Sequence, residues 1–390
     1  MSAARNRGDL DVFILAGEAS GDVLGAGLMQ ALAGEAHGPV RFRGVGGTRM
    51  AAAGLARLFS AHDLSTIGLA AVIAKLPRLS QRLRETVDAI VAAPPDVLIL
   101  IDVPDFSLRV ARRVRRRLPD LPIVKYVSPT VWAWRPGRAR AMRPIVNLIL
   151  AVFPFEPEVH RRLGGPPCVY VGHPLLACLD RLRPSPEEAE MRASHRLVLA
   201  LPGSRRMEIR RLGGVFGDAL ARTADRCGPF ELVVPTLPEL AEEVAAVTAR
   251  WPLPARIVTE EAEKYAAFRR ARAALAASGT VTLELALAGV PHVAAYRISL
   301  IEEVILRMML HIETVVLANL VLDEMVVPQF LQAKCTPVQI AAGLSDVLAD
   351  TPARRRQEQA FARLDAILGA DATSPSVHAA HAVLELLRRA

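Results

Sequence analysis

Cysteine is scarce in this chain of 390 residues, and its four cysteines form no recognisable site. They stand at Cys168, Cys178, Cys227 and Cys335. None belongs to a Cys-x-x-Cys pair, and no pair of histidines has the spacing of zinc ligands. We therefore expect thiols in a reducing compartment and no metal site.

Long apolar runs and aromatic residues are also few. The longest apolar region, 298–322, is interrupted by Glu302, Glu303, Arg307, His311 and Glu313. No run reaches the roughly 18 residues of a membrane span, and the first residues lack the apolar core of a signal peptide. We therefore expect a cytoplasmic protein whose membrane contact is peripheral. An aromatic content of 5% argues against stacking on single-stranded bases.

What the chain does have is apolar and basic character. Hydrophobic residues make up 52% and charged residues 23%, which excludes a disordered chain, and the length suggests two domains. The net charge of +8 indicates an anionic partner, which could be nucleic acid, a phosphorylated substrate or an anionic membrane. Because no nucleic-acid-binding motif is present, we expect no nucleic acid partner.

Short apolar runs alternate with longer amphipathic segments. We predict strands at 11–16, 40–45, 96–101, 122–127, 147–152, 168–171, 196–201, 230–234, 255–258, 273–276 and 291–295. Helices are expected between them and at 336–349, 353–368 and 374–389. This alternation predicts an α/β fold with parallel sheets. The proline-rich stretch 183–186 is the expected linker between domains at 1–183 and 190–350.

Two glycine-bearing loops follow predicted strands, one in each half. The first runs from Gly17 to Asp22 and the second from Pro202 to Arg205. In both, small residues let backbone N–H groups face a ligand where a helix begins, and a helix N-terminus suits phosphate. Two such loops suggest two facing Rossmann-like domains with a ligand between them. In the first loop, Ser20 or Asp22 could instead cap the helix.

A pair of carboxylates follows the most apolar strand. Asp102 and Asp105 lie in the segment 101–106, which Pro104 stiffens. A carboxylate at this edge can take a proton from a sugar hydroxyl. We interpret Asp102 as the chemical residue and Asp105 as the helix cap.

Basic residues and tryptophan concentrate in the first half. The segment 126–135 holds two of the three tryptophans, and 109–143 contains eleven Lys or Arg against one acid, Asp120. Tryptophan can stack on a sugar or lie at a membrane interface, and arginine suits phosphate. Nearby, the apolar segment 67–79 with its cationic residues fits a bilayer interface. The alternatives are a packed loop beside a solvated basic helix, and an ordinary buried helix.

The second half offers a diphosphate cradle. Gly203 permits close approach, Ser204 donates, and Arg205 can bind two phosphate oxygens, with Glu208 three residues on. The segment 278–284 also follows a strand and opens a helix, where Glu284 could accept from ribose hydroxyls or lie exposed.

Six motifs together resemble the lipid A disaccharide synthase family. They are 16–22, 101–106, 126–135, Gly172-His173-Pro174, 201–205 with Glu208, and 278–284, in family order from about Val12 to the C-terminus. The resemblance implies the glycosyltransferase B fold, with C-terminal helices, about 353–390, that return to complete the first domain. It implies UDP-2,3-diacylglucosamine as donor, 2,3-diacylglucosamine 1-phosphate (lipid X) as acceptor, inversion at the anomeric carbon, no cofactor or metal, and work at the inner membrane.

The resemblance also carries residue roles. Asp102 matches an essential carboxylate that is a proposed general base, Arg205 matches an arginine for the nucleotide phosphates, and Glu18 and Ser20 match cleft residues. The catalytic set is therefore Asp102, Glu18 and Ser20. The substrate-binding set is Gly17, Gly21, Asp22, Asp105, Ser128, Trp134, Arg135, His173, Gly203, Ser204, Arg205, Glu208, Ser278, Gly279, Thr280, Glu284, Asn319 and Gln329.

One stretch departs from the family pattern. Where the family commonly has Pro-Asn, then Gly-Arg, before a Val-Pro-Glu-like run, this chain has Ala318-Asn319, then Asp323-Glu324, and Val327-Pro328-Gln329. The basic position is lost, although Asn319 and Gln329 still supply polar groups. Alternatives are an epimerase of the same fold, or a nucleotide- or lipid-binding protein without catalysis. A homodimer is an arrangement that helices crossing between domains would allow.

Overall fold

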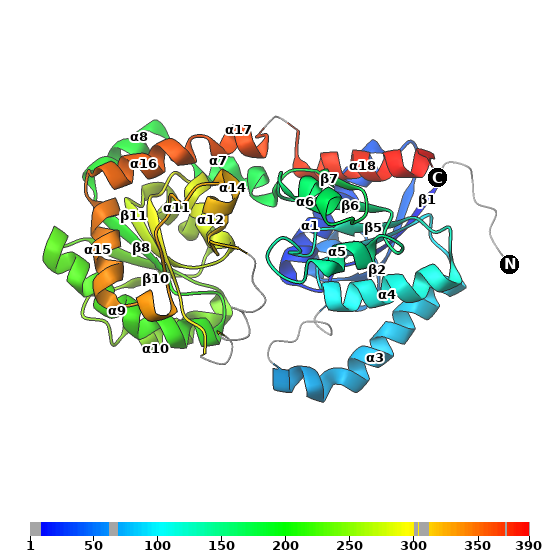
Figure 1. The fold of residues 1–390 in the computed structure, drawn as a ribbon, viewed down its shortest axis with the longest axis horizontal. Coiled ribbons are helices and arrows are strands. Elements are labelled where there is room, and N and C mark those ends of the chain that lie inside the picture. Colours follow the sequence, from blue (N-terminus) through cyan, green and yellow to red (C-terminus); the bar gives the residue numbers. More distant parts are fainter. Residues whose placement is uncertain (1–8, 62–68, 300–302, 304–311, 371–372, 390) are drawn as a thin grey trace. The chain divides into compact units, whose positions relative to one another are not determined.

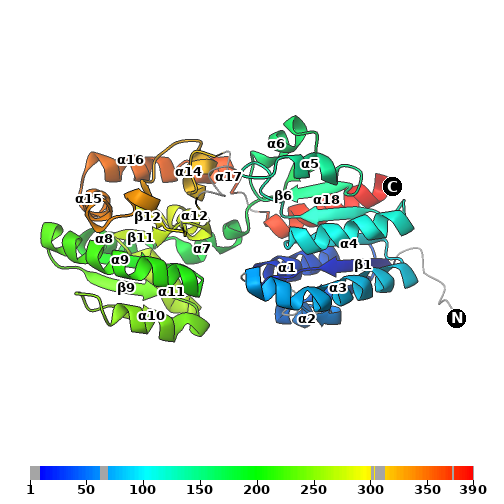
Figure 2. The ribbon, with the colours of Figure 1, turned by 60° about the horizontal axis from the view of Figure 1, so that its bottom comes forward.

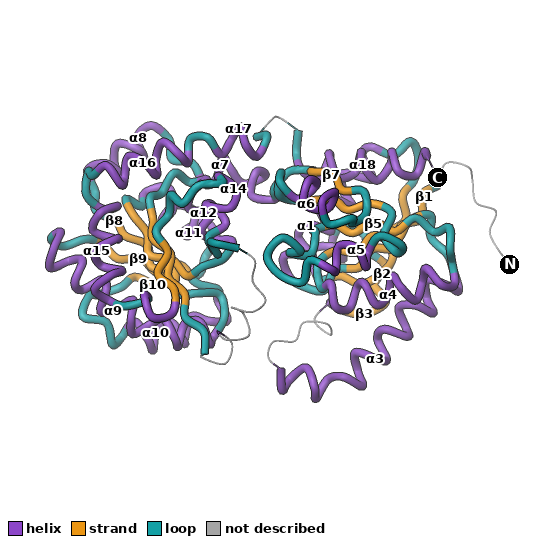
Figure 3. The backbone as a smooth tube through the Cα atoms, viewed as in Figure 1, coloured by secondary structure: helices purple, strands orange, loops and turns teal. Residues whose placement is uncertain are grey.

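The computed structural model describes residues 9–61, 69–299, 303, 312–370 and 373–389, with only the backbone for 69–76. The chain forms two compact units. The first consists of Met1–Leu176 and Asp371–Ala390, and the second is Ala177–Ala370. In each unit the strands lie inside and the helices outside (Figures 1 and 3).

The first unit holds a parallel sheet of seven strands in the order β3-β2-β1-β4-β5-β6-β7. The strands are β1 (Leu10–Leu15), β2 (Val40–Gly46), β3 (Ala56–Ser60), β4 (Val97–Ile101), β5 (Ile123–Tyr126), β6 (Leu148–Ala151) and β7 (Cys168–Tyr170). The helices are α1 (Ala19–Glu35), α2 (Thr48–Ala52), α3 (Leu69–Ala92), α4 (Pro104–Arg117), α5 (Gly137–Met142), α6 (Glu156–Arg162) and α18 (Pro375–Arg389).

The second unit holds a parallel sheet of six strands in the order β10-β9-β8-β11-β12-β13. The strands are β8 (Leu197–Leu201), β9 (Glu231–Pro235), β10 (Arg256–Val258), β11 (Ala273–Ala277), β12 (His292–Tyr296) and β13 (Gln329–Leu331). Its helices are α7 (Leu179–Leu182), α8 (Pro186–Ser194), α9 (Arg206–Cys227), α10 (Ala241–Thr248), α11 (Glu261–Arg270), α12 (Thr280–Leu287), α14 (Leu317–Leu322), α15 (Pro337–Leu348), α16 (Pro352–Phe361) and α17 (Leu364–Leu368).

Strand order fixes where each sheet can bind a ligand. In the first sheet the chain moves outward from β1 to β3 and then resumes on the other side at β4. The second sheet reverses in the same way between β8 and β11. Ligands of open α/β sheets bind beyond the carboxyl ends of the strands at such a switch point. The loops after β1 and β4, and after β8 and β11, are therefore the expected ligand-binding loops.

The eleven predicted strands are confirmed, and the described residues contain two more that were not predicted. In β3, Ala56, Arg57 and Ser60 are exposed, and β13 has only three residues, so neither edge strand has a strong apolar signal. The helix expected at 353–368 is two helices, α16 and α17.

The expected linker at 183–186 is instead a helix start inside the second unit. Ser185 caps α8 in a capping box with Glu188, and Pro186 takes the first helical position, where a missing N–H costs nothing. The units divide after Leu176, earlier than the expected residue 183.

The return of the chain to the first unit is shorter than the expected 353–390. Only α18 belongs to that unit, where it packs on α1, whereas α16 packs on α15 and α17 on α14 (Figure 2).

The apolar segment 67–79 falls partly outside the described residues, and of 69–76 only the helical backbone of α3 is described. Among the helices that the structure describes, none has the length and apolar character to cross a membrane.

Candidate active site

Asp102 lies at the switch point of the first sheet in an uncommon backbone conformation. It follows β4, and both Asp102 (φ 47°) and Val103 (φ 30°) have left-handed backbone, which is unfavourable for a β-branched residue. The Asp102 carbonyl oxygen accepts from Lys125 Nζ at 2.5 Å and from Ser107 Oγ at 3.0 Å. These two donors hold the strained turn in place.

The loop after β1 holds the Asp102 carboxylate. The Gly17 N–H donates to Oδ1 at 2.9 Å, and the Glu18 N–H donates to Oδ2 at 3.2 Å. An ionised carboxyl oxygen can accept about two hydrogen bonds, so each oxygen keeps capacity for a substrate proton. The sequence placed both loops in the site, and the structure brings them together.

Two predicted glycines are needed for this approach. A Cβ on Gly21 would lie 1.7 Å from Asp102 Oδ2, and a Cβ on Gly17 would lie 2.7 Å from both methyl carbons of Val103. Any side chain at either position would displace the carboxylate or its turn.

Burial and charge set the proton affinity of Asp102. Burial raises its pKa to about 6, while the Gly17 N–H and the Lys125 ammonium pull the pKa down. Lys125 is completely buried in β5, and burial lowers its pKa below the usual value, against the opposing effect of Asp102. Asp102 is thus ionised at neutral pH yet basic enough to accept a proton.

Lys125 is a site residue that the sequence interpretation missed. It was counted only among the basic residues of 109–143. A lone lysine in a predicted buried strand was the available signal, because lysine is almost never fully buried without a partner.

The remaining predicted residues of this loop separate into two groups. Glu18 and Ser20 are exposed at the start of α1, and Glu18 makes no capping bond with its side chain. Asp22 is buried, and its oxygens accept from the N–H groups of Gly47, Arg49 and Met50 at 2.7–3.0 Å. Asp22 therefore anchors α2 and is a structural residue, contrary to its predicted role in substrate binding.

Asp105 does not cap a helix. It is exposed in the first turn of α4, and its Oδ1 accepts from Arg138 Nη2 at 2.7 Å. The residue at the cap position is Val103, which makes no side-chain capping bond.

The loop after β5 is anchored by a buried polar cluster. Ser128 Oγ bonds His160 Nε2 at 2.8 Å, and Glu156 accepts from the Val152 and Phe153 N–H groups and from the Trp132 indole. Burial raises the pKa of Glu156 to about 7. Ser128 therefore serves the loop's structure and has no free role as a substrate ligand.

The other predicted residues near this loop also differ in exposure. His173 is buried against Phe153, its Nδ1 accepts from the Leu175 N–H, and burial lowers its pKa to about 4. Trp134 is half-buried and carries the Arg135 guanidinium 4.3 Å from its ring centroid. Trp134 and Arg135 therefore stay within reach of a ligand, whereas His173 is part of the core.

At the switch point of the second sheet, both predicted loops line one cavity of about 350 Å³. Every second-half prediction except Asn319 and Gln329 lines it: Gly203, Ser204, Arg205, Glu208, Ser278, Gly279, Thr280 and Glu284. The helices α9 and α12 begin at this cavity, and neither has a side-chain cap. An added Cβ on Gly279 would meet no atom within 4 Å, so the space before it is open. Open N–H groups at two helix ends suit a diphosphate.

The charged side chains that line this cavity form ion pairs with one another. Glu208 accepts from the Ser204 N–H at 3.0 Å and from Arg205 Nη1 at 3.1 Å. Glu208 therefore holds the conformation of the loop that contains Ser204 and Arg205. Glu284 pairs with Lys264 Nζ at 2.6 Å. Lys264, near the start of α11, is a second lining residue that the sequence interpretation missed, because no local motif surrounds it.

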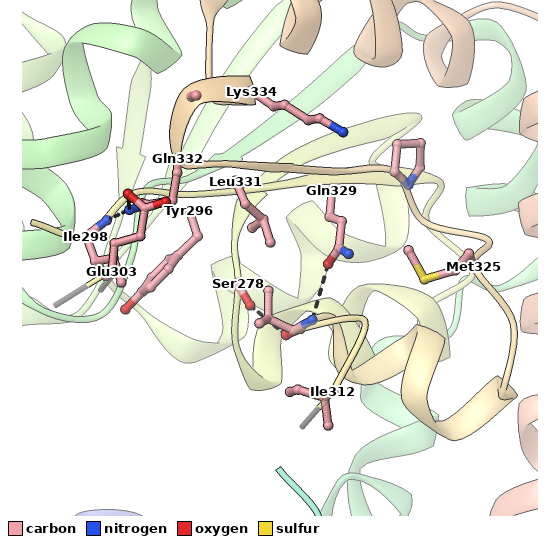
Figure 4. Close-up of a pocket in the computed structure, with 13 residues that line it drawn as sticks. Ser278, Tyr296, Ile298, Glu303, Ile312, Met325, Gln329, Leu331, Gln332 and Lys334 are labelled. Carbon is pink, nitrogen blue, oxygen red and sulfur yellow. Dashed lines mark hydrogen bonds between the residues drawn. The ribbon is translucent and has the colours of Figure 1, made fainter. Parts of the chain in front are cut away.

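A larger cavity of about 1020 Å³ shares Ser278 with the first and has mostly apolar walls (Figure 4). Gln329 lines it, and its Oε1 accepts from the Val315 N–H at 3.2 Å. Asn319 is buried elsewhere and holds the Val326 and Val327 N–H groups, so it is structural. Glu324, in the departing stretch, pairs with Arg356 and Arg363.

Within the described part of the chain, no three His, Cys, Asp or Glu side chains are arranged to hold a metal ion.

Two parallel-sheet units with ligand loops at their switch points define the glycosyltransferase B fold, which glycosyltransferases and sugar-nucleotide epimerases share. The UDP-GlcNAc 2-epimerase from Neisseria meningitidis bound to UDP-GlcNAc aligns with a TM-score of 0.61 at 11% identity, over 98% of this chain and 100% of that one. MurG from Acinetobacter baumannii aligns with a TM-score of 0.56 at 12% identity, over 97% and 99%. Such low identities show the fold alone.

Sequence comparison identifies the family. The family described as lipid-A-disaccharide synthetase matches residues 12–381. The lipid-A-disaccharide synthase of Nitrobacter hamburgensis is 54% identical over 377 residues, which cover 96% of this chain and 95% of that protein. The chain belongs to the lipid-A-disaccharide synthase family and is a glycosyltransferase of lipid A biosynthesis.

Proposed function

We propose that this enzyme transfers 2,3-diacylglucosamine from UDP-2,3-diacylglucosamine to the 6-hydroxyl of lipid X. The products are the β-1,6-linked disaccharide 1-phosphate and UDP. Membership of the family supports the substrates. The observation that carries the chemistry is Asp102, a carboxylate with raised pKa, held by two N–H groups and able to accept another proton.

The reaction is one displacement. Asp102 takes the proton of the acceptor's 6-hydroxyl as that oxygen attacks the donor's anomeric carbon. The bond from that carbon to the UDP oxygen breaks, and UDP leaves with the bonding pair. A single attack from the opposite side inverts the anomeric centre.

The second unit would hold the nucleotide. Gly203, Gly279 and Thr280 offer N–H groups around the cavity, and Ser204 and Thr280 offer hydroxyls. Arg205 meets the negative charge that grows on the departing diphosphate. Both substrates carry acyl chains, so we place the enzyme at the cytoplasmic face of the inner membrane, attracted by its basic first half.

The test is release of UDP from UDP-2,3-diacylglucosamine with and without lipid X, in neutral detergent micelles, with product mass. Acceptor-dependent release of UDP and a disaccharide phosphate support the proposal. UDP-sugar conversion without acceptor would favour an epimerase, which the fold likeness makes the second candidate. Binding without turnover would leave a binding protein.

The base assignment has its own test. Asp102→Asn should lower kcat by about 10²–10⁴, the usual contribution of a general base, while the affinity for UDP stays within twofold. The control is Asp88→Asn, which removes an exposed acid paired with Arg117. Retained turnover in Asp102→Asn would reject Asp102 as the base.

A further inference from the structure

Outside the carboxylate site, the first unit has a groove lined by arginines. It measures about 330 Å³ and runs between α4 and α5. We call it the arginine groove after Arg109, Arg112, Arg135 and Arg138, which line it above the apolar side chains of Leu108 and Met142.

The charge of this groove is largely uncompensated. Asp105 is the one acid that lines it, and Asp105 is bound to Arg138. Arg109 and Arg112 have no ion pair with any other residue that the structure describes. The apolar floor of buried Leu108, Met142 and Ile145 lowers the local dielectric, which strengthens attraction for an anion.

The groove reaches the edge of the sheet where Asp102 lies. Pro104, which lines the groove, begins α4 two residues after Asp102, and Arg135 follows the loop from the adjacent strand β5. Arg109 is about 7.5 Å along the helix axis from Pro104, at 1.5 Å per residue. Helical side chains tilt toward the helix N-terminus, so Arg109 leans back toward that edge.

We propose that the arginine groove binds the phosphate monoester of the acceptor, an assignment that rests on the proposed function. Guanidinium groups match a phosphate with paired hydrogen bonds. The donor's diphosphate has its own cradle in the second unit, so the free charge of the first unit serves the other phosphate. A sugar with its 6-hydroxyl at Asp102 would then direct its phosphate into the groove.

The experiment compares lipid X with its dephosphorylated form, 2,3-diacylglucosamine, as acceptors in neutral micelles. The wild type should prefer lipid X, with the preference in KM. In the double variant Arg109→Ala, Arg112→Ala, the KM for lipid X should rise at least tenfold and the preference should vanish. The KM for the donor should stay within twofold.

A matched control removes the same charge from exposed arginines of the first unit that do not line the groove. Arg117 pairs with Asp88 on α3, and Arg161 pairs with Glu158 on its own helix, α6. The double variant Arg117→Ala, Arg161→Ala should keep the preference for lipid X. If the double variant Arg109→Ala, Arg112→Ala also keeps the preference for lipid X, the groove does not bind the acceptor phosphate. The same conclusion follows if this variant loses only its binding to phosphatidylglycerol vesicles.

A binding measurement that does not depend on turnover distinguishes failure of this proposal from failure of the proposed function. The guanidinium carbons of Arg135 and Arg138 lie 4.3 and 5.8 Å from the centroid of the Trp134 ring. Phosphate bound in the groove should therefore change the fluorescence of Trp134. The wild type should respond to glucosamine 1-phosphate and not to glucosamine, and Trp134→Phe should abolish the response. If the wild type lacks lipid X-dependent turnover, the proposed function fails while this titration still tests the groove. An equal response in Arg109→Ala, Arg112→Ala would overturn the groove assignment.

Discussion

At the scale of single residues, the site depends on a strained turn that glycines make room for. Left-handed backbone at Asp102 and Val103 costs of order 1–3 kcal/mol each. Two side chains bond the Asp102 carbonyl, and two N–H groups bond its carboxylate, which offsets the strain. The turn aims the carboxylate at the loop after β1 and leaves it little freedom to move.

Gly21→Ala should therefore impair activity without unfolding the protein. Gly21 lies inside α1, where alanine favours the helix by roughly 1 kcal/mol, but the new Cβ would meet Asp102 Oδ2 at 1.7 Å. We expect kcat to fall at least 100-fold in the UDP-release assay while the unfolding temperature changes little. The control is Gly34→Ala, also in α1, where a Cβ meets nothing within 4 Å. Full activity in Gly21→Ala would contradict the packing described.

Lys125 should set the acid limit of activity. Asp102 must be ionised to act as base, so kcat/KM should fall as the pH drops through its pKa of about 6. Lys125 lowers that pKa, so Lys125→Met should raise it and shift the acid limb to higher pH. The pH profile of kcat/KM measures this shift. An acid limb that moves to lower pH, or stays in place, would show that Lys125 does not tune Asp102.

At the scale of elements, the sequence predicted those with a strong local signal. Buried strands such as β4 (Val-Leu-Ile-Leu-Ile) are apolar on both faces, and all of them were found. Edge strands β3 and β13 were missed because their hydrogen bonds, not their composition, make them strands. The stretch Pro184–Pro186 looked like a linker, but proline after serine equally well begins a helix, and only tertiary packing decides.

The assignment of 183–186 as a helix start can be tested by measuring the free energy of unfolding. Ser185→Ala removes the side-chain half of the capping box on α8, where Ser185 Oγ accepts from the Glu188 N–H. We expect a loss of about 1 kcal/mol in the free energy of unfolding, measured by urea denaturation. Glu190→Ala, an exposed change in the same helix, should stay within about 0.5 kcal/mol. No difference between the two would mean that 183–186 behaves as a linker.

Of the site, the sequence predicted the loops and missed residues that depend on tertiary contact. The α/β pattern placed the loops at 17–21, 102 and 203–205 directly after strands, and the strand order of the structure puts them at switch points. Lys125 and Lys264 gain their roles only through side chains distant in sequence, Asp102 and Glu284. Asp22 and Asn319 were assigned to substrate because polar residues in loops resemble ligands until their backbone partners are seen.

At the scale of the whole molecule, the chain repeats one architecture twice. In the proposed reaction, one switch point supplies the proton acceptor and the other binds the diphosphate. Each site is built within its own sheet, and the last helix, α18, returns to the first unit after the second is complete. The two binding functions should therefore respond separately to damage in one unit.

A lesion in α18 tests this independence. Val383 is fully buried in α18, which packs on α1, so Val383→Asp buries an unpaired charge at a cost of several kcal/mol. We expect calorimetry to show one unfolding transition at lower temperature and the other unchanged. Turnover should fall because α1 begins beside Gly17 and Glu18, which hold Asp102, while UDP affinity stays within twofold. His381→Ala, which removes only the exposed pair with Glu35, should change both transitions little. Loss of UDP affinity in Val383→Asp would show that the second unit depends on the first for its nucleotide cavity.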